Sequence, residues 1–233
     1  MRVVAFDVSG PWGLFRKPYA PLSPVSFPFP PPPTVLGLVG SICGFSKEEC
    51  LSAVGWEEAR VAVSLLAPAR TVAVGLNLLN TKDGTDRYFR PHKDACRMQI
   101  PHEFLRDPAY RLHVALGPAA GERLEEQLRA GRTVYTPVLG PANCLAEVRF
   151  VAAGEPEPAP QGVPVGSVVP LREGVHVDYE QQRPYLRARV PAAMEPGRRV
   201  TRYQEIVCAL DGQPLAVEGA ELFRLGADVF AFI

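Results

Sequence analysis

Apolar positions in the N-terminal part of the chain follow two different periods, one of about two residues and one of about 3.6 residues. Over 3–8, large apolar side chains alternate with small or polar ones before a Ser-Gly-Pro turn, which predicts a buried strand. Over 34–45 the apolar positions recur every three or four residues and predict a helix. Ser46 with Glu49 three residues later forms a capping box, which predicts the start of a second, short helix.

Further strands and one further helix are predicted downstream. The runs 60–66 and 71–78 are rich in β-branched and aliphatic residues and lie on either side of Pro68, so they predict a hairpin. The other elements predicted in this region are a strand over 110–115, a helix over 118–131 with Pro first and Gly last, and a strand over 146–150.

The order of these elements predicts the fold class. Strand, helix, two strands, a long excursion, strand, helix and strand is close to the split βαβ arrangement of ferredoxin-like folds. The excursion lies at 80–103, where the periodicity is lost, and the Pro- and Glu-rich residues 153–162 predict a linker. The sequence therefore predicts an α+β chain with a ferredoxin-like domain over 1–152 and a small β-rich domain over 163–233.

The composition is typical of a globular protein without a membrane span. Hydrophobic residues make up 47% and charged residues 21% of the chain, and no window approaches about 18 consecutive apolar residues. Lys plus Arg equals Asp plus Glu at 25 each, so a polyanionic partner has to be sought in local clusters of charge. The five cysteines are dispersed without a Cys-x-x-Cys pair, which argues against disulfides and structural zinc. We expect a cytoplasmic protein, without metal or cofactor, whose N-terminus is not a signal peptide.

The proline-rich loop over 10–33 combines positive charge with aromatic rings. Eight prolines lie between Pro18 and Pro33, and Arg16 and Lys17 have no acidic residue beside them. Cations bind phosphates and flat rings stack on unstacked bases, so this composition favours single-stranded nucleic acid. The alternative is that the loop covers the core and its rings are buried. The aromatic residues are Trp12, Phe15, Tyr19, Phe27 and Phe29.

Three other features suit a similar ligand. Gly37, Gly40 and Gly44 lie on one side of the predicted helix and allow either tight packing on a sheet or the approach of a nucleic-acid backbone. The excursion over 80–103 has a surplus of basic residues around two aromatic ones, typical of a basic finger or of a solvated loop. The segment 183–202 holds six arginines against one acid, which suits phosphates or an acidic partner subunit, unless it is a solvated β face.

Long stretches of the chain resemble the Cas-five family, the RAMP-type subunits of type I CRISPR Cascade complexes, and most nearly its I-A and I-B branches. The resemblance rests mainly on GPWGLFRKPY over 10–19 and SPVSFPFPPPPTVLGLVGSI over 23–42. Shorter stretches that add to it are QIPHEFL over 99–105, DPAYRL over 107–112 and YTPVLGPANC over 135–144.

This resemblance implies a ferredoxin-like RAMP domain with a thumb insertion at the excursion. It also implies a subunit of an antiviral complex that binds and caps the 5′ handle of the guide RNA (crRNA), while base pairing reads the target. The implied partners are the Cascade backbone subunit, the large subunit and, through the complex, target DNA. Carried over by position, the RNA-binding residues are Arg16, Lys17, Tyr19 and Ser23 in the loop, Thr34, Gly37 and Ser41 on the helix, Arg87, Tyr88, Arg90 and Lys93 in the thumb, and Gly140, Asn143 and Cys144.

Two other functions remain open from the sequence. One branch of the family cuts precursor crRNA without metal through Tyr, Lys and His, and Tyr88, His92 and Lys93 lie close together here. In the branches that the N-terminal motif resembles, a separate subunit cuts the RNA, so we expect a binder without catalytic residues. The proline-rich loop could instead be a PPII ligand for a partner protein, although its alternating aromatic residues favour burial.

Overall fold

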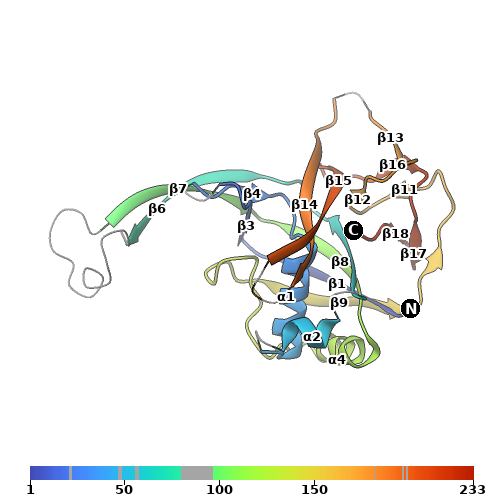
Figure 1. The fold of residues 1–233 in the computed structure, drawn as a ribbon, viewed down its shortest axis with the longest axis horizontal. Coiled ribbons are helices and arrows are strands. Elements are labelled where there is room, and N and C mark those ends of the chain that lie inside the picture. The colour runs from blue at the N-terminus through green and yellow to red at the C-terminus, as the bar shows by residue number, and fades with distance from the viewer. Residues whose placement is uncertain are drawn as a thin grey trace.

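The computed structural model describes residues 1–20, 23–46, 49–55, 58–79, 97–180, 182–195, 197 and 199–233. Its elements are mostly antiparallel strands with few helices, so the chain is α+β as predicted (Figure 1). A four-stranded antiparallel sheet has the strand order β9-β1-β8-β5. Its strands are β1 (Val3–Ser9), β5 (Arg60–Leu65), β8 (Ala109–Ala115) and β9 (Glu147–Gly154). In the part of the chain described, no helix is long and apolar enough to span a membrane.

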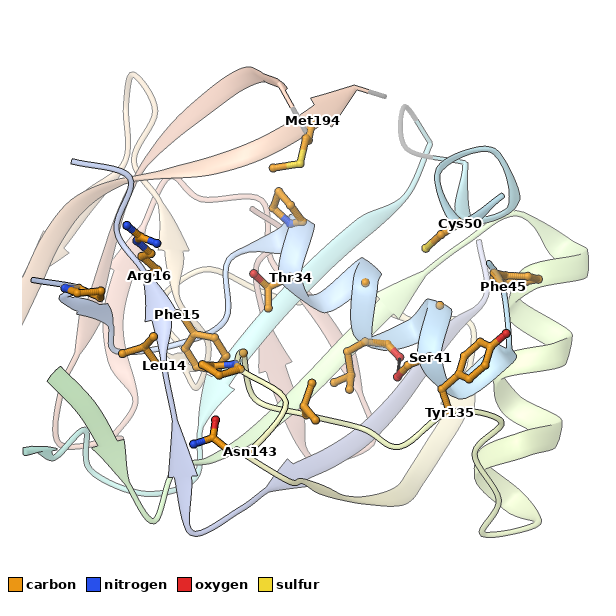
Figure 2. A pocket seen from close by; sticks show the side chains of 18 of the residues that line it. Leu14, Phe15, Arg16, Thr34, Ser41, Phe45, Cys50, Tyr135, Asn143 and Met194 are labelled. Carbon is orange, nitrogen blue, oxygen red and sulfur yellow. Dashed lines mark hydrogen bonds between the residues drawn. The ribbon is translucent and has the colours of Figure 1, made fainter. Parts of the chain in front are cut away.

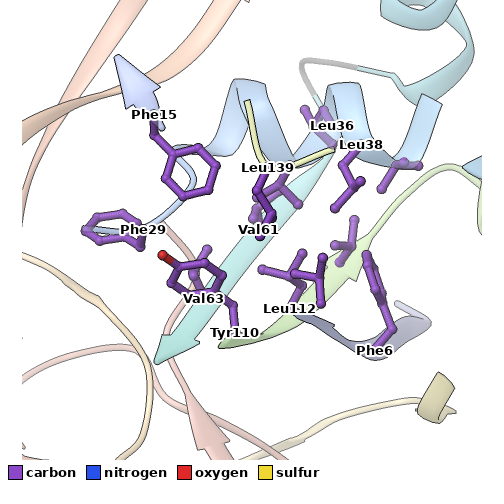
Figure 3. Packing of buried hydrophobic residues seen from close by; sticks show 14 of the residues in the cluster. Phe6, Phe15, Phe29, Leu36, Leu38, Val61, Val63, Tyr110, Leu112 and Leu139 are labelled. Atoms are coloured by element: carbon purple, nitrogen blue, oxygen red, sulfur yellow. The ribbon is translucent and has the colours of Figure 1, made fainter. Parts of the chain in front are cut away.

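Both faces of this sheet are covered, which explains why β1 is apolar at almost every position. On one face, the sheet packs against α1 (Pro32–Cys43) and α4 (Pro118–Arg129). Figure 3 shows side chains of this cluster, which include Leu36 and Leu38 of α1 and Leu112 of the sheet. On the other face, Val3, Ala62 and Ala115 form a small cluster with Phe230 and Phe232 near the C-terminus.

The ends of the helices follow local rules. Pro32 and Pro33 stand in the first turn of α1, where a missing N–H costs no hydrogen bond. The helix ends at Gly44, which has a φ of 76° and donates its N–H to the carbonyl of Gly40. Before α2 (Cys50–Val54), the predicted capping box is confirmed, since Ser46 and Glu49 exchange two hydrogen bonds of 3.2 Å.

The predicted hairpin between 60–66 and 71–78 is wrong. β5 pairs with β8, whereas β6 (Thr71–Leu79) pairs with β7 (Arg97–Arg106). The burial patterns give the reason, because β5 is buried at four of its six positions and suits the covered sheet, whereas β6 alternates between exposed and half-buried positions.

β6 and β7 form a long antiparallel ribbon that extends away from the rest of the molecule (Figure 1), and the short strand β2 (Trp12–Gly13) pairs with the end of β7. The part of the predicted excursion from Arg97 onward is therefore a regular strand, which is a second correction to the sequence analysis. Within it, Met98 and Ile100 alternate with Arg97 and Gln99, a two-residue period that the sequence analysis overlooked. Residues 80–96 lie outside the described part of the chain.

The C-terminal third is rich in strands, as predicted, and they form three antiparallel sheets. Most of these strands are short, but two of them, β14 (Tyr185–Glu195) and β15 (Arg199–Ala209), have eleven residues each. One sheet contains β12 (Val169–Pro170), β14 and β15, another contains β11 (Pro164–Val165), β13 (His176–Asp178) and β16 (Leu215–Glu218), and the third contains β10 (Glu157–Pro158), β17 (Phe223–Leu225) and β18 (Asp228–Phe230). Val168, Val190, Ile206, Cys208 and Ile233 belong to the same buried cluster as β1 and α1. The predicted division into two domains stays a prediction, and its two parts share this core.

A network of charged side chains joins the central sheet to β18. Arg111 on β8 lies between Asp7 of β1, at 2.8 Å, and Asp228, at 3.1 Å. Arg149 on β9 also contacts Asp7, and the buried His113 contacts Asp228. Burial raises the pKa of Asp7, but the hydrogen bonds from both arginines outweigh it and the pKa lies below its ordinary value. The hydrogen bond with His113 likewise lowers the pKa of Asp228.

Candidate functional site

A groove of about 1470 Å³ runs along α1. Three segments that are distant in sequence form its walls, namely the loop that follows β1, the exposed side of α1 and the loop that precedes β9, and residues of the β6–β7 ribbon and of the β14–β15 region also line it. Figure 2 shows Arg16 near the first turn of α1 and Tyr135 near its last turn. Six of the residues carried over from the family resemblance line this groove, namely Arg16, Thr34, Gly37, Ser41, Gly140 and Asn143.

The first wall is held in place by a small hairpin of β3 (Phe15–Arg16) and β4 (Ser26–Phe27). The Phe15 N–H donates to the Ser26 hydroxyl at 2.9 Å, and the Ser26 N–H donates to the Glu103 carboxylate on β7 at 3.1 Å. The backbone around Arg16 is thus tied both to itself and to the ribbon. Arg16 is exposed and stands at the edge of the groove.

Burial of the loop's aromatic side chains, the alternative left open above, applies to three of the five. Phe15, Phe27 and Phe29 are at most 4% exposed and belong to the core. Trp12 and Tyr19 are exposed. The cation–aromatic pattern in the sequence therefore mixes core rings with surface rings, which a linear pattern cannot separate.

The second wall is α1, whose three glycines have different roles. A Cβ at Gly40 would collide with the Cys50 sulfur of α2, so this glycine permits the packing of two helices. Gly44 is the left-handed C-cap and also lies against Val134. At Gly37, which is exposed in the groove, a Cβ would meet no described atom within 4 Å. Nothing in the described fold therefore explains a glycine at 37, and the space above it is open to a ligand.

The third wall is the loop before β9. The Leu14 N–H donates to the Leu139 carbonyl at 2.9 Å, which brings this loop against the first wall. Gly140 has a φ of 106°, and a Cβ there would overlap the Leu14 carbonyl oxygen. Asn143 is exposed with its amide at the groove, whereas Cys144 is buried and does not line it. Burial raises the pKa of the Cys144 thiol, so its contribution is to packing.

The remaining predicted residues are placed elsewhere. Lys17, Tyr19 and Ser23 belong to the loop but do not line the groove, and the Lys17 ammonium lies 5.8 Å from the centre of the Phe27 ring. The predicted thumb and alternative catalytic residues lie outside the described part of the chain. These are Arg87, Tyr88, Arg90, His92 and Lys93.

The structure adds lining residues that the sequence analysis missed. Phe45 and Tyr135 stand at the end of α1, and Met194 and Glu195 reach the groove from the tip of β14. Tyr135 opens the stretch 135–144 that resembles the family, so that stretch was the one available signal. The tip of β14 lies within the arginine-rich segment 183–202, but its position over α1 follows only from the tertiary fold.

In the described part of the arginine-rich segment 183–202, three of the six arginines have acidic partners, so the segment carries less uncompensated positive charge than its composition predicted. Ion pairs join Arg183 to Asp211 at 3.0 Å, Arg187 to Glu205 at 2.8 Å, and Arg199 to Glu195. Arg189 lies over the Tyr203 ring, 4.9 Å from its centre. Two of these acids lie beyond the segment in sequence and are brought next to it by the fold, so a linear count of charge missed them.

Comparisons with known proteins place this fold and groove in context. No curated protein matches the chain. A CRISPR protein from Archaeoglobus fulgidus has a TM-score of 0.56 at 14% identity, with 100% of this chain and 99% of that chain covered. A chain of a CRISPR RNA-guided surveillance complex has a TM-score of 0.54 at 12% identity, with 97% and 95% covered. A structure described as a Cas protein has a TM-score of 0.52 at 15% identity, with 90% and 95% covered.

Identities this low show similarity of fold alone. The sequence itself matches a family described as "CRISPR-associated protein (Cas_Cas5)" over residues 3–205. That match includes all three walls of the groove and most of β15. The chain therefore belongs to the Cas_Cas5 family of CRISPR-associated proteins.

Proposed function

We propose that this chain binds the 5′ handle of crRNA in the groove along α1 and caps that end of the guide, without cutting it. The observation that carries the proposal is the convergence of Arg16, Gly37 and Asn143 on one groove from three separate segments. The family resemblance indicates an RNA-binding role for each of these residues from the sequence alone. Three residues chosen without regard to function would be expected at unrelated places on the surface.

The chemistry of the groove suits an RNA backbone. Hydroxyl groups on Thr34 and Ser41, the Asn143 amide and the Arg16 guanidinium supply donors for phosphate and ribose oxygens. Gly37 lets that backbone approach the helix closely. The volume of about 1470 Å³ exceeds the roughly 300–1000 Å³ of sites for small molecules, so a segment of polymer fits better.

The fold supports a finer assignment within the family. The order β9-β1-β8-β5 with both long helices on one face is the arrangement expected of a ferredoxin-like RAMP domain. The β6–β7 ribbon would form the base of the thumb. We propose assembly with the Cascade backbone and large subunits, contact with target DNA through that complex, and placement nearest the I-A and I-B branches.

The proposal is tested by purifying the chain from a host that carries the neighbouring subunits and sequencing any bound RNA. A handle-containing crRNA with a single 5′ end is expected. Recovery of the complex with guides of random 5′ ends would contradict the role of a cap.

Removing the two cations of the loop should weaken RNA binding and reduce its dependence on salt. In the double variant Arg16→Ala, Lys17→Ala, loss of up to two phosphate contacts should lower the slope of log K against log salt by about 1 to 2. The measurement is a salt titration of crRNA binding by the full chain. The charge-matched control is Arg172→Ala, Arg224→Ala, two exposed cations outside the groove, which should keep the wild-type slope. An unchanged slope in the first variant would remove both residues from the interface.

The purified chain should not cut repeat RNA, with or without magnesium. Metal-free cleavage needs a base at the 2′-hydroxyl and an acid at the 5′-oxygen that leaves, and we assign that step to a separate subunit. Incubation with labelled repeat RNA, resolved on a denaturing gel, checks this. Cleavage at one site that disappears in His92→Ala or Lys93→Ala would instead favour the endoribonuclease in which Tyr88, His92 and Lys93 act.

A further inference from the structure

One aromatic ring at the end of α1 lies open in the groove. Tyr135 is 53% exposed, although it lines the groove together with Phe45 and Ser46. Figure 2 shows its ring beside the last turn of α1, at the opposite end from Arg16. The described fold buries Phe15, Phe27 and Phe29, so this exposure sets Tyr135 apart from the other rings near α1.

The backbone that carries this ring is fixed. The Tyr135 N–H donates to the Ser41 carbonyl at 2.9 Å and the Val134 N–H donates to the Ile42 carbonyl at 3.2 Å. Both acceptors belong to the last turn of α1, whose carbonyls have no partner within the helix. Val134 also fills the space beside Gly44. The backbone that carries the ring is therefore held in place before any ligand binds, which lowers the entropy lost on binding.

The surroundings of the ring combine a second flat side chain with hydroxyl groups. Phe45 is half-buried, and the Arg123 guanidinium lies over its ring at 5.2 Å from the centre. The Ser41 hydroxyl donates to the Leu38 carbonyl at 2.7 Å, which leaves its oxygen free to accept a hydrogen bond. The Ser46 hydroxyl accepts from the Glu49 N–H, which leaves its proton to donate. A flat apolar face bordered by one acceptor and one donor suits the face and edge of a nucleobase.

We propose that Tyr135 is a stacking platform for one unstacked base of the RNA in the groove. This inference rests on the proposed function, because it takes the groove to hold single-stranded RNA. Arg16 and its neighbours hold the backbone at one end of α1, and Tyr135 holds a base at the other end. The contact at Arg16 is electrostatic and the contact at Tyr135 is stacking. The affinity that comes from the first falls with salt concentration, whereas the affinity that comes from stacking depends much less on salt.

The test compares the loss of the Tyr135 ring with the loss of single bases from the RNA. The crRNA recovered with the complex is synthesised with a fluorescent 3′ end and with each handle position in turn made abasic. Binding by the full chain is compared for wild type, Tyr135→Ala and Tyr135→Phe. Tyr179→Ala is the matched control, because Tyr179 is 52% exposed and lies outside the groove.

One abasic position should weaken binding by wild type about 5- to 100-fold, and Tyr135→Ala should weaken binding of intact RNA by a similar factor. Tyr135→Ala should bind that abasic RNA no more weakly than either change alone allows. The slope of log K against log salt should be the same as for wild type. Tyr135→Phe and Tyr179→Ala should bind like wild type. Equal binding by Tyr135→Ala and wild type, or a loss that is additive with every abasic position, overturns the stacking role but not RNA binding. Failure of wild type to bind the RNA overturns the proposed function as well. A loss of a co-purifying subunit with RNA binding unchanged would assign Tyr135 to a protein contact.

Discussion

Replacing Gly37 with glutamine is expected to weaken crRNA binding by at least about tenfold, equivalent to about 1.4 kcal/mol, while the free protein stays folded. A Cβ at 37 meets no described atom within 4 Å, so the substitution fits the free structure. Removing a glycine from the middle of a helix should even stabilise the fold by about 0.5 to 1 kcal/mol. The larger side chain would, however, occupy the place of the RNA backbone in the groove. Binding and thermal unfolding of the same preparation check both effects.

The matched control is Gly121→Gln in α4. Gly121 is also a helical glycine, and a Cβ there would lie 4.0 Å from the Leu116 carbonyl, an ordinary contact. It does not line the groove, so the control should gain stability without losing RNA. Equal binding by the two variants would mean that RNA does not pass over Gly37. Loss of folding in Gly37→Gln alone would mean that the glycine serves the fold.

Replacing Asp7 with asparagine is expected to lower the free energy of unfolding at neutral pH by about 3 kcal/mol. The carboxylate of Asp7 accepts hydrogen bonds from Arg111 at 2.8 Å and from Arg149 at 2.8 Å, and it is 9% exposed. Its removal leaves the partly buried Arg111 with Asp228 alone. Denaturant unfolding of both proteins measures the difference. The control Glu205→Gln removes an exposed ion pair with Arg187 and should change stability much less.

This effect should depend on pH in a defined direction. The pKa of Asp7 lies below its ordinary value in the folded chain, so its contribution is fully present above the unfolded pKa of about 3.9. As the pH falls through the folded pKa, the carboxylate is protonated and the contribution is lost. The difference between wild type and Asp7→Asn should therefore be constant from pH 5 to 7 and shrink below about pH 4. A difference that persists at pH 2 would assign the effect to packing.

Local elements were predictable where one local rule acts alone. The two long helices and the capping box between Ser46 and Glu49 depend on residues within a few positions of each other. The strand over 110–115 is found as β8, although His113 and Ala115 are buried as well, so the alternation predicted the strand and not the burial of its second face. The partner of β5 was not predictable in this way. Both β6 and β8 have sequences that could pair with β5. Which of them pairs with it depends on which faces of the central sheet are covered.

The same distinction between local and tertiary determinants applies to the candidate site. The sequence by itself selected Arg16, Gly37 and Asn143, because a long motif carries family resemblance even before any contact is known. Only the tertiary structure placed the three on one groove, added Tyr135, and paired three of the six arginines of 183–202 with acids. The physical reason is the separation along the chain of the residues that determine each feature. Helix caps and strand alternation are set by neighbours in the chain, whereas exposure, charge neutralisation and the shape of a groove are set by residues that only folding brings together.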